Sequence, residues 1–148
     1  MSDASRPAVV EFLARYRSVC EVGVGRRPGV AAALADRGVD ARATDVAPRD
    51  VPDSVRFVVD DVVDAAARDD PGDVYRVDAV YALNCPPELH RPLLAVARAV
   101  DAACLFTTLG GDPAAVPATP VTVPGDTVHV ARDPDGRAAG GADESERP

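Results

Sequence analysis

Lysine and tryptophan are both absent from this 148-residue chain, and each of its 16 basic residues is an arginine. Acidic residues outnumber them, since 19 Asp and 5 Glu make up a total of 24 and give a formal net charge of −8. A surface of this sign repels the phosphates of nucleic acids and repels itself in dilute buffer. Together with abundant alanine, valine and aspartate, this composition is typical of a cytoplasmic protein from a salt-accumulating archaeon. We therefore interpret the acidity as an adaptation to solvent, which identifies no partner.

Cysteine is scarce, and its spacing excludes a zinc ribbon. Cys20, Cys85 and Cys104 lie far apart and form no Cys-x-x-Cys pair. This spacing also argues against a disulfide framework and fits a reducing cytoplasm. Because no cluster of histidines and acids has the spacing of a metal site, we predict no metal centre.

Long apolar runs are missing as well. The first ten residues, MSDASRPAVV, lack a charged start followed by an apolar signal core, and no apolar run approaches the roughly 20 residues of a membrane span. We expect a soluble, intracellular protein with no membrane partner. The length suits one domain with one core, which we place over residues 1–132. Residues 133–148 have almost no apolar content, and we expect a disordered acidic tail there.

The remaining sequence alternates between strand and helix patterns. We expect strands at 18–23, 40–45, 55–59, 77–83 and 102–107, and helices at 8–17, 28–37, 62–69 and 87–100. This alternation predicts an α/β class, a Rossmann-like, doubly wound and mostly parallel sheet. After residue 111, proline-rich pieces at 120–123 and 127–131 predict a possible antiparallel hairpin at one edge of the sheet.

A glycine-rich turn between the first strand and the next helix is the best candidate for a binding site. Gly23 and Gly25 can take positive φ without a Cβ clash and let a ligand lie against the backbone. Asp45 follows Gly25 by 20 residues, about the interval at which a Rossmann acid meets ribose hydroxyls. Glu21 ends the first strand at the same edge. We therefore expect an adenosine-type ligand at the carboxyl edge of the sheet.

Two other interpretations of the turn stay open. A dinucleotide fingerprint needs a third glycine where this chain has Pro28, although Arg26 and Arg27 at a helix N-terminus suit a pyrophosphate or a carboxylate. Gly23 and Gly25 also fit a plain structural turn with no ligand.

The segment Glu21-x-Gly23-x-Gly25 resembles the first motif of S-adenosylmethionine-dependent methyltransferases. The resemblance implies that Glu21 lies near the methionine portion, that the two glycines pass beneath the cofactor and that Asp45 holds the ribose. It also implies that Asp61, or its neighbour, accepts a hydrogen bond from the adenine amino group. An N-cap of the next helix is an equal alternative for Asp61. The chain is short for the full seven-stranded core of that family.

Residues 21–45, with Asp60-Asp61 and the run 86–89, also resemble the archaeal uncharacterised protein family 0146 over about residues 7–130. Members of that family resemble methyltransferases in fold, and no activity is established for the family as a whole.

Asn84 and Cys85 follow the fourth predicted strand. Asn84-Cys85-Pro86-Pro87 resembles the Asn-Pro-Pro-aromatic motif of amino-methylating enzymes, but Cys85 interrupts it and Glu88 replaces the aromatic ring. We include Asn84 among the cofactor-binding candidates and expect the prolines to start a helix. A catalytic pair of Cys85 with His90 is a minor alternative, since His90 is expected to face solvent or cap the helix.

The leading hypothesis is a protein that binds S-adenosylmethionine or a related adenosine ligand through Glu21, Gly23, Gly25, Arg26, Asp45, Asp61 and Asn84, with methyl transfer to an unknown acceptor. Two alternatives remain. One is a ligand-sensing or interaction module with the same fold and no chemistry, and the other is a nicotinamide nucleotide-binding protein.

Overall fold

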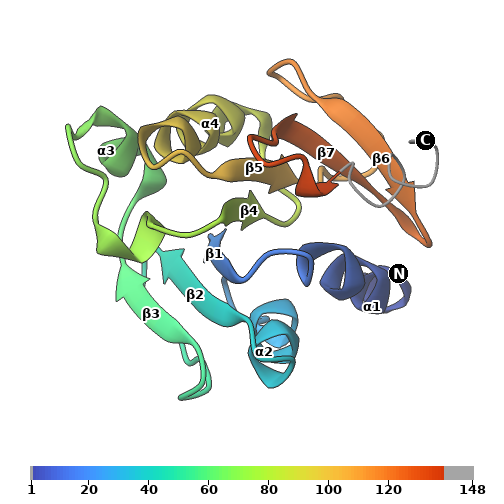
Figure 1. The fold of residues 1–148 in the computed structure, drawn as a ribbon, viewed down its shortest axis with the longest axis horizontal. Coiled ribbons are helices and arrows are strands. Elements are labelled where there is room, and N and C mark those ends of the chain that lie inside the picture. The colour runs from blue at the N-terminus through green and yellow to red at the C-terminus, as the bar shows by residue number, and fades with distance from the viewer. Residues whose placement is uncertain (1, 139–148) are drawn as a thin grey trace.

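One seven-stranded sheet forms the centre of the protein (Figure 1). The computed structural model describes residues 2–138, with side chains from residue 7 onward. The strands run in the order β3-β2-β1-β4-β5-β7-β6. Their bounds are β1 Ser18–Val22, β2 Asp40–Asp45, β3 Arg56–Val59, β4 Ala79–Ala82, β5 Ala103–Phe106, β6 Thr119–Val123 and β7 Asp126–Arg132. The helices are α1 Ser2–Leu13, α2 Gly29–Asp36, α3 Val62–Ala67, η1 Asp73–Tyr75, η2 Pro87–Leu89 and α4 His90–Ala99.

The strand directions confirm the predicted fold class. Strands β1 to β5 are parallel, whereas β7 is antiparallel to both β5 and β6. Although the chain is short for the full seven-stranded methyltransferase core, it forms seven strands. Seven strands fit because β2 joins β3 through residues 46–55, and β5 joins β6 through residues 107–118, with no helix in either connection. The expected hairpin is the pair β6 and β7.

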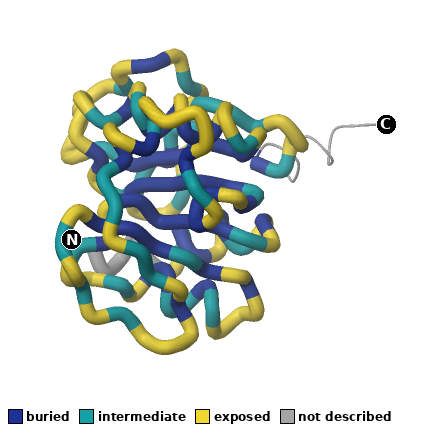
Figure 2. Tube along the Cα trace, turned by 90° about the vertical axis from the view of Figure 1, so that its left-hand side faces the viewer, coloured by how far each residue is buried: buried dark blue, intermediate teal, exposed yellow. Residues whose placement is uncertain are grey.

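Two apolar layers sandwich the sheet because successive strand residues point to opposite faces. On one face, α1 and α2 pack against Val19, Tyr81 and Leu105. On the other face, α3 and α4 pack against Cys20, Val80 and Phe106. Figure 2 shows the strands as the buried centre, with exposed residues gathered in the surrounding helices and loops. The first helix begins earlier and ends earlier than the predicted range 8–17, yet its apolar residues still contact the sheet.

Strands β1 and β4 are neighbours whose chains leave the sheet toward opposite faces. From β1 the chain enters α2, and from β4 it passes through η2 into α4 (Figure 1). Such a divergence opens a crevice at the carboxyl ends of the two strands, where open α/β sheets bind ligands.

The C-terminal part of the described chain contacts the domain. Ala138 is buried, and its backbone oxygen accepts a hydrogen bond from Arg15. Residues 139–148, which hold most of the predicted acidic tail, lie outside the described residues. Within residues 2–138 no helix combines the length and apolar character needed to cross a membrane. The described residues also contain no group of three or more potential metal ligands from His, Cys, Asp or Glu.

Candidate functional site

The glycine turn after β1 takes the strained backbone conformation that its sequence predicts. Gly23 has φ of +74° and Gly25 has φ of +62°, a region that side-chain-bearing residues rarely adopt. The backbone N–H groups of Gly23 and Val24 both donate to the carbonyl oxygen of Thr44, at 2.9 and 3.0 Å. The turn is therefore fastened to the end of β2.

Asp45 holds the same turn from its other side. Its side chain is 7% exposed, and its Oδ2 accepts a 2.7 Å hydrogen bond from the Gly25 N–H. Its Oδ1 accepts from the Ala47 N–H at 3.1 Å and lies 3.3 Å from Nε of Arg49. Burial alone would raise the pKa of Asp45, but these hydrogen bonds and the arginine lower it. A carboxylate has about four acceptor positions, of which these contacts use three.

Glu21 is a second buried carboxylate at the end of β1. It is 2% exposed, and its Oε1 accepts a 2.8 Å hydrogen bond from the hydroxyl of Tyr81 on β4. Burial, together with the charge of Glu21, raises the pKa of Tyr81 well above its ordinary value. Tyr81 therefore stays protonated and fixes the orientation of the glutamate.

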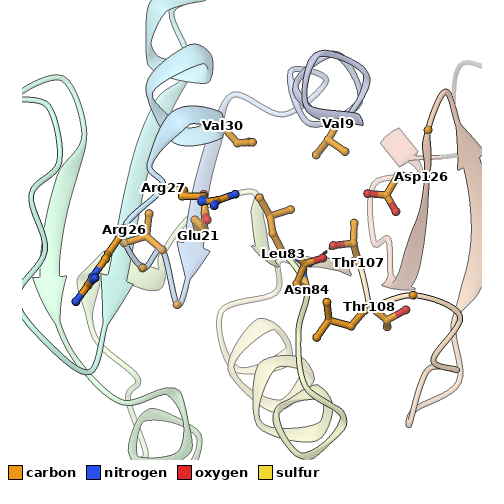
Figure 3. Close-up of a pocket in the computed structure, with 16 residues that line it drawn as sticks. Val9, Glu21, Arg26, Arg27, Val30, Leu83, Asn84, Thr107, Thr108 and Asp126 are labelled. Atoms are coloured by element: carbon orange, nitrogen blue, oxygen red, sulfur yellow. Dashed lines mark hydrogen bonds between the residues drawn. The ribbon is translucent and has the colours of Figure 1, made fainter. Parts of the chain in front are cut away.

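A cavity of about 760 Å³ opens above these groups, on the side of the sheet covered by α1 and α2. The size lies within the range of small-molecule sites. In Figure 3, Arg27 and Glu21 lie close together at one side of this space, Asp126 faces it from the opposite side, and Arg26 extends away from it. The lining comprises Val9, Glu21, Gly23, Val24, Gly25, Arg26, Arg27, Val30, Leu83, Asn84, Thr107, Thr108, Leu109, Gly110, Gly125 and Asp126.

A smaller pocket of about 110 Å³ lies on the α3 and α4 side of the same strand ends. Its walls are mostly apolar and consist of Val22, Gly23, Val62, Ala82, Leu83, Asn84, Cys85, Pro86, Leu89 and Leu93. Three residues, Gly23, Leu83 and Asn84, line both this pocket and the larger cavity. The two spaces therefore meet across the ends of β1 and β4.

Asn84 forms part of that shared border. It is exposed and takes a positive φ of 50°, a conformation that asparagine tolerates better than most residues. Its backbone N–H donates to Oγ1 of Thr107 at 2.8 Å, and the next N–H, from Cys85, donates to the Thr107 carbonyl at 2.8 Å. The loops after β4 and β5 are thereby held side by side.

Asp61 does not line either space. Its Oδ1 accepts a 2.9 Å hydrogen bond from the Val63 N–H, so it is the N-cap of α3, as the alternative interpretation had it. The neighbouring Asp60 accepts hydrogen bonds from Nη2 of Arg68 at 2.7 Å and from the hydroxyl of Tyr75 at 2.8 Å. Both acids thus have structural partners in this structure.

The expectation that His90 faces solvent or caps the helix is wrong. The residue is fully buried and stacks on Phe106 with ring centroids 4.1 Å apart. Its Nδ1 accepts from the Ala115 N–H at 2.9 Å, which leaves the hydrogen on Nε2 to donate to the Cys85 carbonyl at 3.0 Å. Burial and the charge of Glu88 raise the pKa of the Cys85 thiol to about 12. A catalytic thiolate–imidazole pair is therefore not formed.

The structure brings Glu21, Gly23, Gly25, Arg26 and Asn84 to one cavity and puts Asp45 directly beneath its glycine turn. Sequence reasoning missed Thr107, Thr108 and Asp126 on the opposite wall. No local motif marks these three residues. Thr107 and Thr108 follow β5 and reach the cavity because β5 pairs with β4, whereas Asp126 reaches it because β7 pairs with β5.

Comparisons with solved structures show the fold alone. One similar structure is the Burkholderia thailandensis 1,6-didemethyltoxoflavin-N1-methyltransferase with bound 1,6-didemethyltoxoflavin and S-adenosylhomocysteine, with a TM-score of 0.51 and 21% identity. Another is the CcbJ methyltransferase from Streptomyces caelestis, with a TM-score of 0.50 and 19% identity. The alignments cover 87% and 86% of this chain but only 61% and 59% of those chains. The fold is therefore methyltransferase-like.

Sequence comparisons show the family. Residues 5–133 match the family described as "Uncharacterised protein family (UPF0146)". A UPF0146 protein of Halobacterium salinarum is 52% identical over 129 residues, which are 86% of this chain and 96% of that protein. The chain therefore belongs to the uncharacterised protein family UPF0146.

Proposed function

We propose that this protein binds S-adenosylmethionine, or a closely related adenosine ligand, across the ends of β1 and β4. The observation that carries the proposal is the junction of two unlike spaces at Gly23, Leu83 and Asn84. One space is small and apolar, and the other is large and contains a buried carboxylate, Glu21. S-Adenosylmethionine has matching ends, a flat aromatic base and a charged amino-acid tail.

In this proposal the ligand lies over the glycine turn. The adenine ring places one edge in the smaller pocket, against Val62 and Leu89, and the amino group of the tail points to Glu21. Gly23 and Gly25 allow the ligand to lie against the backbone, because neither has a Cβ. Asp45 lies beneath the turn and lines neither space, and in this proposal its fourth acceptor position receives one ribose hydroxyl.

The remaining predicted contacts fit this pose to different degrees. Asn84 lies where the adenine base and the amino-acid tail of the ligand would meet, so its amide can form a hydrogen bond to either of them. We propose a weaker, long-range role for Arg26, whose side chain extends away from the cavity (Figure 3). Asp61 would need to leave its N-cap bond with Val63 to reach an adenine amino group.

A nicotinamide nucleotide fits the same turn less well. A pyrophosphate needs backbone N–H groups at the glycine turn and the following helix. Here the Gly25 N–H already donates to the Asp45 carboxylate, whose negative charge would repel a phosphate. The N-cap position of α2 is Pro28, which has no N–H to offer. We therefore favour a ligand without phosphate.

We further propose methyl transfer as the activity. The methyltransferase-like fold supports this, as does the S-adenosylhomocysteine bound by the Burkholderia neighbour. The cavity beside Glu21 extends well beyond the glycine turn to Thr108 and Asp126, so a second reactant has access to the sulfonium group.

Calorimetry in molar potassium chloride tests the proposal. S-Adenosylmethionine and S-adenosylhomocysteine are expected to bind saturably at one site, and NADH is expected not to bind. Glu21→Gln retains an acceptor for Tyr81 but loses the charge, so affinity should fall about tenfold or more. The matched control is Glu88→Gln, an exposed residue that lines neither space.

Two results would contradict this assignment. Tighter binding of NADH than of S-adenosylhomocysteine would support the nicotinamide alternative. Failure of all three ligands to bind the folded protein would instead favour a scaffold or interaction module.

We also propose that the protein works in a salt-accumulating cytoplasm. The support is its lack of lysine, its net charge of −8 and a relative in Halobacterium salinarum. Acidic surfaces of this kind repel themselves unless counterions screen the charge. Unfolding temperatures measured from low to molar salt should rise steeply, and a flat salt dependence would refute the proposal.

A further inference from the structure

The cavity is larger than one ligand tail requires. The amino-acid tail and the ribose of S-adenosylmethionine, counted with the sulfur and methyl carbon, have seventeen non-hydrogen atoms. At no more than roughly 30 Å³ per atom, the volume that liquid water takes per molecule, they fill at most about 510 Å³. Of the cavity, which measures about 760 Å³, at least about 250 Å³ is left for a second molecule.

The unfilled part lies between β5 and the turn of the hairpin. Its polar walls are Thr107 and Thr108, which follow β5, and Asp126, which begins β7. Figure 3 shows Asp126 facing the cavity from the side opposite Arg27 and Glu21. Asp126 is half-buried, and its Oδ1 accepts a hydrogen bond from the Thr127 N–H at 2.8 Å. Its Oδ2 is thus available to a molecule in the cavity.

Charge decides what kind of molecule suits this region. Arg26 and Arg27 belong to the glycine turn, so the only charged group on the β5 and β7 side of the described cavity lining is a carboxylate. A carboxylate accepts hydrogen bonds and stabilises positive charge. Nucleic acid is disfavoured because its phosphates would meet a protein of net charge −8.

We propose that this region holds the methyl acceptor, a small molecule whose amino group is bound by Asp126. The inference rests on the function proposed above and adds the substrate class. An acceptor of at least about eight non-hydrogen atoms fits the remaining space, because roughly 30 Å³ is an upper limit for the volume of each atom. Val9 and Leu109 give the lining an apolar part, which suits an alkyl or aryl amine.

The transfer step follows from this placement. The lone pair of the neutral amine forms a bond to the methyl carbon while the carbon–sulfur bond breaks. The electron pair of that bond stays on sulfur, which becomes the neutral thioether of S-adenosylhomocysteine. The nitrogen becomes a methylated ammonium and later loses its proton to water. Asp126 stabilises the positive charge that develops on nitrogen during this step.

A pair of matched probes tests the acceptor class. Tyramine and 4-ethylphenol differ by an amino group, and both are titrated into the protein in the presence of saturating S-adenosylhomocysteine in molar potassium chloride. In the wild type, tyramine should bind about tenfold more tightly than 4-ethylphenol. Asp126→Asn keeps the Oδ1 acceptor for Thr127 and should remove that preference. The control is Asp112→Asn, which changes an exposed acid outside the cavity and should keep it.

The two levels of the proposal fail separately. If S-adenosylhomocysteine binds but the amine preference is absent, or survives in Asp126→Asn, the acceptor class is wrong and the cofactor assignment stands. If S-adenosylhomocysteine does not bind, the proposed function is wrong. Transfer of labelled methyl groups to RNA or protein, with none to small amines, would also overturn the acceptor class.

Discussion

Removal of the Asp45 carboxylate should loosen the glycine turn and weaken ligand binding together. In Asp45→Ala, the N–H groups of Gly25 and Ala47 lose their acceptor, and Arg49 loses its ion pair. An unsatisfied backbone donor costs about 1–3 kcal/mol when buried, and both donors here are half-buried. We therefore expect a loss of about 2–3 kcal/mol, which lowers the melting temperature of a domain this size by about 5–10 °C.

The measurement is thermal unfolding at pH 7 in molar potassium chloride, paired with calorimetry of S-adenosylhomocysteine. At this pH the full contribution of Asp45 is present, because its lowered pKa means that the contribution is lost only under acidic conditions. Affinity should fall at least tenfold. Asp53→Ala, which removes an exposed acid from the same loop, should change stability by less than about 0.5 kcal/mol. If Asp45→Ala has the same melting temperature as the wild type, this account of the turn is refuted.

Two further predictions concern the backbone and the acidic residues. Gly25→Ala should destabilise the fold by about 1–2 kcal/mol, because at a φ of +62° a Cβ lies too close to its own following carbonyl oxygen, although it meets no neighbouring residue closely. Gly111→Ala, in open space at an ordinary φ, should be near neutral in the same urea titration. Burial alone would raise the pKa of Asp60, but Arg68 and Tyr75 lower it, so its stabilisation is present at neutral pH and lost as pH falls below about 4. Asp60→Asn should therefore lose less stability than the wild type between pH 7 and pH 3, and equal losses would contradict the assignment.

Much of the fold follows from local patterns. Buried parallel strands have short apolar runs, and the helices between them show apolar residues at helical spacing, so every strand and every α-helix except the first falls near its predicted range. The glycine turn was also predictable, since Gly23 and Gly25 supply a conformation that other residues avoid. The count of seven strands follows likewise from the five predicted strands and the two strands of the predicted hairpin.

The candidate site was only partly predictable, because tertiary contacts decide which partner each polar group finds. The spacing of Gly25 and Asp45 indicated that they would meet, but not that the carboxylate would accept the Gly25 N–H. Helical spacing puts His90 on the same face as the buried Leu93 and Leu94, but it does not indicate that two loops supply partners for both ring nitrogens. In the sequence, Asp126 is typical of a turn residue, and only the pairing of β7 with β5 brings it to the cavity.

Amide chemical-shift mapping tests the central claim most directly, because it reports binding and its location together. The ¹⁵N-labelled protein is titrated with S-adenosylhomocysteine in molar potassium chloride. The account predicts saturable shifts centred on Gly23, Leu83 and Asn84, where the two spaces meet, and on Gly25 in the larger cavity. A spectrum of the folded protein that does not change, or shifts confined to residues far from the ends of β1 and β4, would contradict it.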